Sequence, residues 1–399
     1  MGSSVLTHSP AGSLTHPSDV AIEPSIQYHD PLEHIMSTTR SLRPRSRYAA
    51  DDDDDFPVIS EDMKLQHERA IALRFGSRDS LHCRIDHPLA IAIDPENGHF
   101  LVSDKRRVSE FSRDGTFVRG LGGRLRGSLA LSYDSTNKRI AVADEDDCIC
   151  LLARDGSAAD IRLGARDDSR CQGSCAVYDP THDRYLVCRP MQGCIDAYSA
   201  QGASLGSIAP LDGERRLREV CCIAVDSVFE RILALVDNHV VVLSSHGKRL
   251  FKFGGKGVRE GRLMHPCAVA VYNGSAGPPQ YIVCDTSNHR LQAFTHEGHF
   301  ISSFGSRGSR DGQFQHPKFV AIDPIRGELA VTDSHNHRVQ VIGAGRWLSF
   351  PWRIERHRWV HRPVRKAVLT MTMIRSLEPT CVVSLLPNEL LFEIFQYLG

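Results

Sequence analysis

The amino-acid sequence predicts an all-β protein, a six-bladed β-propeller with an extension at each end. Two observations lead to this fold class. An apolar run that closes near an acidic residue occurs six times, and successive copies lie 40 to 51 residues apart. Each copy continues with the same order of short apolar runs and turns, which is typical of four antiparallel strands. Four-stranded units repeated at this period indicate blades arranged around an axis.

The first run of each copy identifies the innermost strand of a blade. It reads LAIAID at 89–94, and both of its faces are apolar, as expected for a strand covered on both sides. Its final position is Asp94, Asp134, Asp179, Asp226, Asp323 and, in one copy, Tyr272. The third run, such as RVSEFS at 107–112, alternates apolar and polar residues, so we expect this strand to have one wet face.

The ends of the repeat region predict how the ring closes. The sixth copy has only three clear strands, whereas the segment 71–88 resembles 300–317, which holds the fourth strand and following loop of the fifth copy. We therefore expect the N-terminal strand Ile71–Gly76 to complete the last blade. A ring that stayed open would expose one face of the first blade and one face of the last blade. Pairing of this strand with the last blade would close the ring.

Copies five and six share a phrase, CDTSNHRLQAF at 284–294 and TDSHNHRVQVI at 332–342. In the first copy we expect Asp285 to accept backbone N–H groups of its turn and to pair with Arg290, and Asn288 to take a left-handed conformation. The same roles are expected in the second copy. This local structural interpretation does not exclude a second one, in which the histidines and arginines of the phrase touch a ligand.

The phrase, together with the His-Pro pair that precedes the inner strand, resembles the NHL repeat. Residues 69–345 are similar to the NHL propellers of the tripartite-motif–NHL family, and the last two copies carry the resemblance most strongly. The resemblance implies a recognition module that binds a protein target or single-stranded RNA on one face. No paired zinc ligands or heptads occur in this chain, so RING-type ligase activity is not implied.

Basic residues gather in the loops that a propeller presents on one face. The candidate ligand face consists of Arg78, Arg106, Arg107, Arg259, His289, Arg290, Arg307, Arg310, His337 and Arg338. Cations suit phosphate groups, but the few aromatic residues of these loops make the RNA assignment weak. Loops that merely keep the disc soluble are the alternative.

The propeller is expected to have no catalytic residue, metal or cofactor. Metal-assisted chemistry at the axis needs His, Asp or Glu on several inner strands, which offer almost none. The histidines of the repeated phrase are expected to bind no metal, because equivalent loops of different blades lie apart.

Composition limits the remaining classes of function. The 48 basic and 48 acidic residues argue against a globally basic nucleic-acid binder. No apolar run reaches the roughly 18 residues that span a bilayer, so we expect a cytoplasmic protein without a membrane span. The twelve cysteines include no Cys-x-x-Cys pair, which predicts buried reduced thiols and no zinc module.

The two extensions differ in character. Residues 1–68 are polar and include the run Asp51–Asp55, which predicts disorder. Residues 346–383 form a linker of Trp and basic residues, which could bind nucleic acid or an anionic membrane surface or could pack on the propeller.

Residues 384–399 predict an amphipathic helix that resembles the start of an F-box. Its apolar stripe with the initial proline is Leu386, Pro387, Leu390, Leu391, Ile394, Phe395 and Leu398. The resemblance implies docking to a Skp-type adaptor of a cullin ubiquitin ligase; a plain amphipathic helix is the alternative. The first functional hypothesis is therefore substrate recognition in ubiquitination and proteasomal turnover, and the second is post-transcriptional control through RNA binding.

Overall fold

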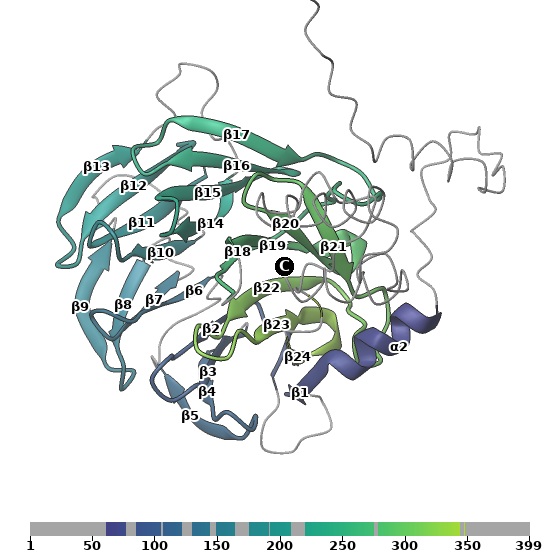
Figure 1. Cartoon of the computed structure of the whole chain (residues 1–399). Coiled ribbons are helices and arrows are strands. Elements are labelled where there is room, and N and C mark those ends of the chain that lie inside the picture. Colours follow the sequence, from purple (N-terminus) through teal and green to yellow (C-terminus); the bar gives the residue numbers. More distant parts are fainter. Residues whose placement is uncertain are drawn as a thin grey trace, which may run out of the picture. The chain divides into compact units, whose positions relative to one another are not determined.

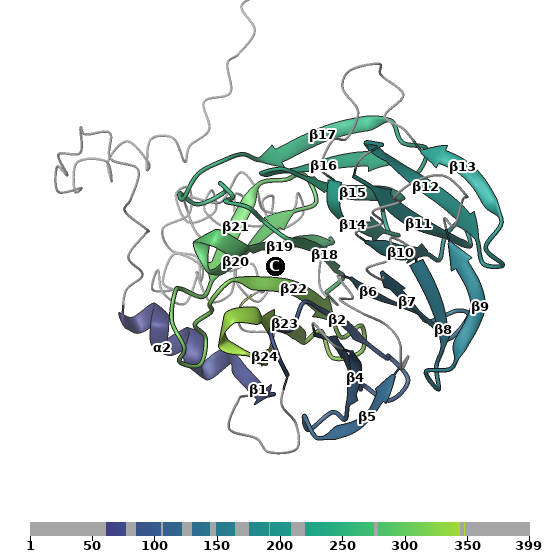
Figure 2. The ribbon, with the colours of Figure 1, turned by 180° about the vertical axis from the view of Figure 1, so that it is seen from behind.

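The computed structural model describes most of the predicted propeller. The described residues are 61–76, 85–104, 107–121, 130–143, 149–163, 175–190, 192–208, 220–274, 278–343 and 347. Their strands form six four-stranded antiparallel sheets arranged in a ring, which confirms the predicted six-bladed propeller (Figure 1). The view from behind shows the same ring with β2, β6, β10, β14, β18 and β22 nearest its centre (Figure 2).

Each of the first five blades is a run of four consecutive strands. Blades 1 and 2 are β2(Ala90–Ile93), β3(Phe100–Ser103), β4(Val108–Phe111), β5(Phe117–Leu121), and β6(Leu131–Asp134), β7(Arg139–Ala143), β8(Ile149–Ala153), β9(Ala158–Leu163). Blades 3 and 4 are β10(Ala176–Asp179), β11(Arg184–Arg189), β12(Cys194–Ser199), β13(Ser204–Ile208), and β14(Val220–Asp226), β15(Arg231–Val236), β16(His239–Ser244), β17(Arg249–Gly254). Blade 5 is β18(Ala268–Tyr272), β19(Gln280–Asp285), β20(Arg290–Thr295), β21(Phe300–Phe304).

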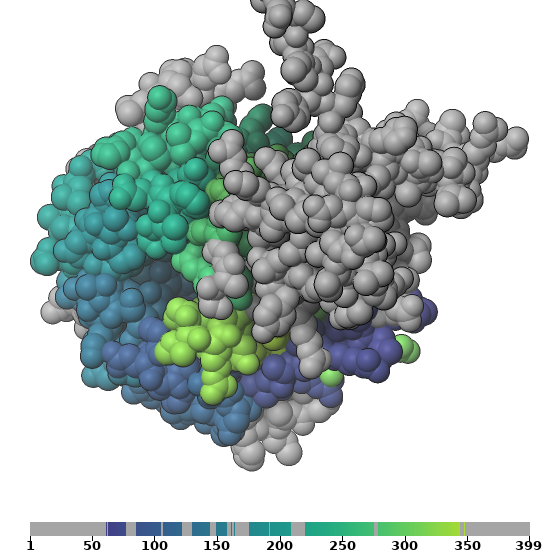
Figure 3. Space-filling model, in the orientation of Figure 1, coloured from purple at the N-terminus to yellow at the C-terminus, as the bar shows by residue number. Residues whose placement is uncertain are grey.

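Blade 6 is completed by the N-terminal strand, as predicted. Its strands are β22(Pro317–Ile322), β23(Leu329–Asp333), β24(Arg338–Ile342) and β1(Ile71–Phe75). Ile71 pairs with Ile342 and Phe75 with Val339 in the antiparallel register. In Figure 3 the purple surface of the N-terminal elements accordingly meets the yellow-green surface of blade 6.

Burial is greatest in the second and third strands of blades 5 and 6, where the inner strands β18 and β22 are only partly buried, unlike the prediction of inner strands covered on both faces. The fourth strands β5 and β13 are largely exposed, whereas β2 is buried throughout. The third strands β4 and β20 are buried on both faces instead of having one wet face. Their polar side chains, such as that of Gln292, are buried and hydrogen-bonded within the protein. The alternation of apolar and polar residues in these strands therefore does not indicate a solvent-exposed face.

The acidic position at the end of the inner strand joins neighbouring blades. The carboxylate of Asp226 in blade 4 accepts a hydrogen bond from the Tyr281 hydroxyl of blade 5 (2.9 Å), and the Asp134–Tyr185 pair repeats this contact between blades 2 and 3. Burial and the adjacent carboxylate raise the pKa of Tyr281 above its ordinary value, which keeps the hydroxyl a donor.

The turn between the third and fourth strands contains a glycine for two reasons, the positive φ of the backbone and the lack of space for a Cβ. Gly115 and Gly298 have φ of 83° and 84°, a conformation that favours glycine. A Cβ at these positions would lie 2.7 Å from Phe75 and 2.8 Å from Phe253, which belong to the outer strand of the preceding blade. The turn glycine therefore lets adjacent blades approach closely.

Part of the segment expected to be disordered is helical. Helix α2(Glu61–Ala70) precedes β1, and its His67 lies 8% exposed with its ring centroid 4.3 Å from that of Phe304. The Gly305 N–H donates to His67 Nδ1 (3.2 Å), and the Gly343 N–H donates to the Ala70 carbonyl (2.9 Å). These contacts with the propeller, which local polarity does not reveal, hold the helix.

Stability should depend on pH through His67. Burial lowers the pKa of this imidazole from its ordinary 6.5 to about 4, so the unfolded chain takes up the proton first as pH falls. The stabilisation is complete above pH 6.5, and about 3 kcal/mol is lost as pH falls towards 4. In urea unfolding at several pH values, His67→Gln should show a shallower decline below pH 6.5. The control His299→Gln, at an exposed position, should keep the wild-type decline.

Candidate functional site

The repeated phrase of blade 5 builds a buried network that holds the loop before the blade. The Asp285 carboxylate is fully buried and accepts hydrogen bonds from Asn288 (2.8 Å), Arg290 (2.8 Å), Gln292 (2.8 Å) and a backbone N–H of loop 255–265 (2.7 Å). Other N–H groups of the three side chains donate to carbonyl groups of the same stretch, at 2.6 to 3.1 Å. The phrase therefore fixes the conformation of the loop between β17 and β18.

Blade 6 repeats this network almost atom for atom. Asp333 accepts from Asn336 (2.8 Å), Arg338 (2.8 Å), Gln340 (3.3 Å) and a backbone N–H of loop 306–316 (2.7 Å). Burial raises the pKa of Asp333, while the Arg338 guanidinium and the other donors oppose that rise. The duplicated phrase is thus a structural unit that shapes two neighbouring loops.

Two sequence-based expectations about the phrase need correction. Arg290 and Arg338 are 4% and 5% exposed, and their guanidinium groups donate inward, so we remove them from the candidate ligand face. The left-handed residues are His289 (φ 56°) and His337 (φ 55°), not the asparagines. Each follows a short 3-10 turn, η2(Thr286–Asn288) or η3(Ser334–Asn336), which leaves the asparagine amide free to donate to the preceding loop.

Five histidines, here called the histidine row, follow one another across blades 5, 6 and 1. They are His289, His316, His335, His87 and His337, and successive ring centroids lie 4.5, 4.4, 5.9 and 4.1 Å apart. The backbone N–H of His316 donates to His289 Nδ1 (3.1 Å), and that of His87 donates to His337 Nδ1 (3.2 Å). His316 and His87, which lie in the loops before the inner strands of blades 6 and 1, join the histidines of the repeated phrase into one row.

Sequence reasoning missed His87, His316 and His335 as members of the row. A signal was present, because a His-Pro pair precedes the inner strand at His87, at His316 and also at His265. All three histidines have positive φ, 52°, 53° and 43°. What the sequence does not give is the neighbouring blade against which each ring packs.

The first two imidazoles of the row, those of His289 and His316, are neutral at pH 7. Burial lowers the pKa of His289 to about 4, and nearby His316, Arg307 and His335 add to the effect. Burial, followed by His335 and Lys318, also lowers the pKa of His316. His289 is buried and His316 is half-buried, so of these two neutral rings only that of His316 is accessible.

Exposed cations lie on the two loops that the networks hold, and Arg307 is near His289 and His316. We call Arg259, Arg262, Arg307 and Arg310 the loop cations; all four are exposed. The buried guanidiniums donate to the carbonyl groups of three of them, Arg259, Arg262 and Arg310. The loop cations, with the histidine row, define the loop face. Glu260 and Asp311 are the acidic side chains of the same two loops.

The other predicted site residues divide into two groups. Arg107 is exposed, and its guanidinium lies 5.4 Å from the ring centroid of Phe117. Arg78, Arg106 and the apolar stripe of 384–399 lie outside the described residues, as does the linker 346–383 apart from Trp347.

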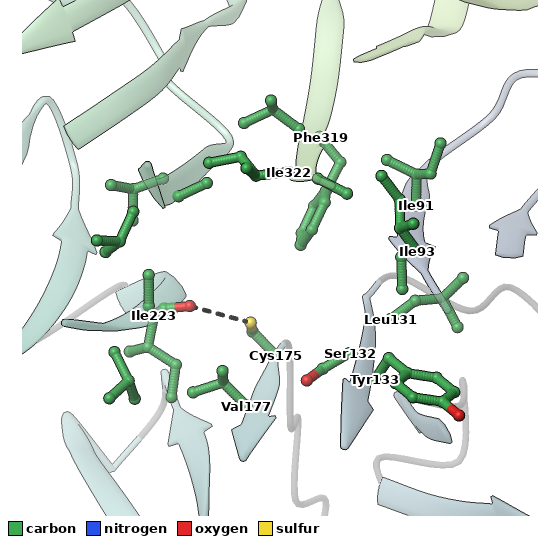
Figure 4. A pocket seen from close by; sticks show the side chains of 18 of the residues that line it. Ile91, Ile93, Leu131, Ser132, Tyr133, Cys175, Val177, Ile223, Phe319 and Ile322 are labelled. Carbon is green, nitrogen blue, oxygen red and sulfur yellow. Dashed lines mark hydrogen bonds between the residues drawn. The ribbon is translucent and has the colours of Figure 1, made fainter. Parts of the chain in front are cut away.

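The hub of the propeller holds an apolar cavity of about 340 Å³. Side chains of all six inner strands line it, and Figure 4 shows among them Ile91, Ile223 and Phe319. Cys175 lies at its wall, with Sγ 3.9 Å from the Ile223 carbonyl oxygen. No His, Asp or Glu is among the described residues that line this cavity.

Two further findings concern the described residues as a whole. The eight cysteines among them are free thiols, four buried and four half-buried. None of the described helices is long and apolar enough to cross a membrane.

Comparison with known proteins places the repeated phrase in a known repeat. Residues 314–342 match the NHL repeat. The chain is 42% identical to Protein brain tumor of Drosophila melanogaster over 91 residues, 23% of this chain and 8% of that protein. It is 45% identical over 91 residues to the B-box type zinc finger protein ncl-1 of Caenorhabditis elegans, again 23% of this chain, and 10% of that protein. It is 31% identical over 82 residues to the RING finger protein nhl-1 of the same organism, 21% of this chain and 8% of that protein.

Solved structures show likeness in fold alone. An auxiliary nutrient binding protein from Bacteroides ovatus superimposes with a TM-score of 0.54 at 18% identity, over 68% of this chain and 72% of that chain. A second one, from Bacteroides thetaiotaomicron, gives 0.53 at 15% identity with the same coverage. The matched segments of the three relatives above make up only 8% to 10% of their lengths. The chain therefore contains an NHL repeat within a six-bladed β-propeller, which confirms that part of the resemblance.

Proposed function

We propose that this protein is a non-catalytic recognition scaffold that binds single-stranded RNA on its loop face. The observation that carries the proposal is four exposed guanidinium groups on the same loop face as three accessible imidazole rings, the exposed His335 and the half-buried His87 and His316. Guanidinium groups bind phosphates, and planar side chains stack on unpaired bases. The imidazoles supply the planar surfaces that the loops lack in Phe, Tyr and Trp.

The distribution of exposed apolar residues supports an anionic partner over an apolar one. The large hydrophobic side chains exposed among the described residues lie on α2, on outer strands and on turns between first and second strands. They are Met63, Leu65, Val118, Leu205, Val228, Phe229, Leu250 and Ile325. None belongs to the loop face, whereas protein interfaces usually centre on aromatic and apolar anchors.

The apolar hub supports the non-catalytic part of the proposal. Catalysis by a propeller of this kind needs metal ligands or proton-transferring groups that converge on the axis. The described lining instead consists of alanine, branched aliphatic and a few small polar or aromatic side chains.

RNA binding can be tested by fluorescence anisotropy of the full chain with a labelled single-stranded RNA pool. We expect affinity to fall steeply as salt rises. Arg259→Glu with Arg307→Glu should weaken binding and lower the slope of log K against log salt by about 1.4, since each lost phosphate contact removes roughly 0.7. The matched control is Arg326→Glu, which makes the same charge change at an exposed turn between β22 and β23. An Arg326 effect equal to the loop-cation effect, or binding that ignores salt, would contradict the proposal.

A second candidate function is substrate recognition for a cullin ubiquitin ligase, with a protein target on the propeller. The F-box-like stretch 384–399 favours it. Co-purification of the full chain with a Skp-type adaptor should be lost on Leu390→Asp or Ile394→Asp and kept on Glu393→Asp. Failure of the unmodified chain to retain the adaptor would rule this function out.

A further inference from the structure

One end of the histidine row differs from the rest because a carboxylate joins it. Oδ1 of Asp86 lies 2.9 Å from His87 Nδ1 and 3.3 Å from His337 Nδ1. One ligand atom from each of these three residues lies within 4.8 Å of the others. The Asp86 and His87 side chains are 26% and 31% exposed and that of His337 is 9% exposed, so the cluster is reachable from solvent.

We propose that Asp86, His87 and His337 form a binding site for a divalent transition metal of the Zn²⁺ class. Imidazole nitrogen and carboxylate oxygen are ordinary ligands of Zn²⁺, with bonds of about 2.0–2.2 Å. Two ligands of a tetrahedral Zn²⁺ therefore lie roughly 3.3 Å apart. The two separations from Asp86 Oδ1, 2.9 and 3.3 Å, are close to that value.

The Asp86 carboxylate and His337 Nδ1 face each other at this place. This Nδ1 accepts the backbone N–H of His87 (3.2 Å), so this nitrogen carries a lone pair. The same lone pair faces the Asp86 carboxylate at 3.3 Å, and two acceptors at that distance repel each other. A metal ion that coordinates both atoms would take the place of the His87 N–H at Nδ1, so metal binding requires that hydrogen bond to open.

The chain contains a second pair that lacks only the carboxylate. His289 and His316 repeat the geometry of His337 and His87, with an N–H to Nδ1 distance of 3.1 Å and ring centroids 4.5 Å apart. The residue before His316 is Gln315, where the residue before His87 is Asp86. A neutral amide in place of the carboxylate removes one anionic ligand, so the second pair serves as an internal control.

The site spans the seam at which the ring closes. Asp86 and His87 precede the inner strand of blade 1, whereas His337 belongs to blade 6. A bound metal would join the first and last blades on the loop face, in addition to the joint made by β1. Metal binding should therefore raise the melting temperature, because a ligand that binds only the closed ring stabilises it.

The test uses the full chain without a polyhistidine tag, treated with chelator and kept reduced. Zn²⁺ uptake is measured by calorimetric titration, and Co²⁺ serves as a visible-absorption probe of a tetrahedral site. Asp86→Gln replaces the carboxylate by an amide, the group that Gln315 carries beside the second histidine pair. This variant should lose one Zn²⁺ equivalent or at least about tenfold in affinity. It should also lose the Zn²⁺-induced rise in melting temperature.

His289→Gln changes the second pair and should leave both readouts unchanged. Asp86 is part-exposed, so its replacement is expected to fold, and His337→Gln provides a second variant if it does not. Equal Zn²⁺ uptake and an equal melting shift in wild-type and Asp86→Gln proteins would overturn the proposal. Equal losses in Asp86→Gln and His289→Gln would overturn it as well, because the metal would then not depend on the carboxylate cluster.

Discussion

Replacing Phe75 by alanine should lower the free energy of unfolding by about 3–5 kcal/mol. Phe75 is 8% exposed and belongs to β1, which pairs with β24 of blade 6. Its ring, however, packs against Phe100 and Phe111 of blade 1, with centroids 5.2 and 5.0 Å away. Truncation therefore removes apolar burial at the joint that closes the ring. Guanidinium unfolding followed by fluorescence and circular dichroism measures the loss.

The control for Phe75 is Val118→Ala on the outer strand β5. Val118 is 45% exposed, and its truncation should change stability by no more than about 0.5 kcal/mol. If both variants unfold at the same denaturant concentration as the wild type, β1 does not fasten the ring and the closure described above is wrong.

Replacing Arg338 by alanine should cost about 3–5 kcal/mol of stability. The change leaves the fully buried Asp333 carboxylate without its charge partner at 2.8 Å, and it frees two carbonyl groups of loop 306–316. Arg338→Lys should lie between alanine and wild type, because an ammonium keeps the charge but cannot reproduce the three-donor geometry. Thermal and urea unfolding give the values.

Arg326→Ala is the matched control, since Arg326 is exposed and lies in a turn on blade 6. It should be nearly neutral in stability. A neutral effect of Arg338→Ala as well would show that Asp333 needs no cation, and that the repeated phrase does not hold the loop before its blade.

The repeat period made the fold predictable, because each blade must place the same kinds of side chain at the same depth. The closing strand was also predictable, since 71–88 resembles a segment whose place in the fifth copy is clear. Contacts between blades were not predictable from the pattern. Alternation in β20 suggested a wet face, yet Gln292 is fully buried because the adjacent loop supplies its partners.

The orientation of the candidate site residues also depends on contacts between blades, so the sequence predicts it only in part. The sequence places His289 and Arg290 in one turn but does not say which of them faces outward. Asp285, one strand away, draws the arginine inward, and the imidazole then meets His316 of the next blade. Arg259, Arg307 and Arg310 are exposed on their loops, and their role in binding stays a prediction.

The pairing of Ile71 with Ile342 also bears on how the protein is made. During synthesis the first strand leaves the ribosome long before its partner exists, so blade 6 cannot be completed until the last strands have emerged. Until then the unpaired edge of β1 and the uncovered side of blade 1 are open to wrong partners. A ring fastened by its two most distant strands is thus slow to assemble, and we expect nascent chains to need the protection of chaperones for most of their synthesis.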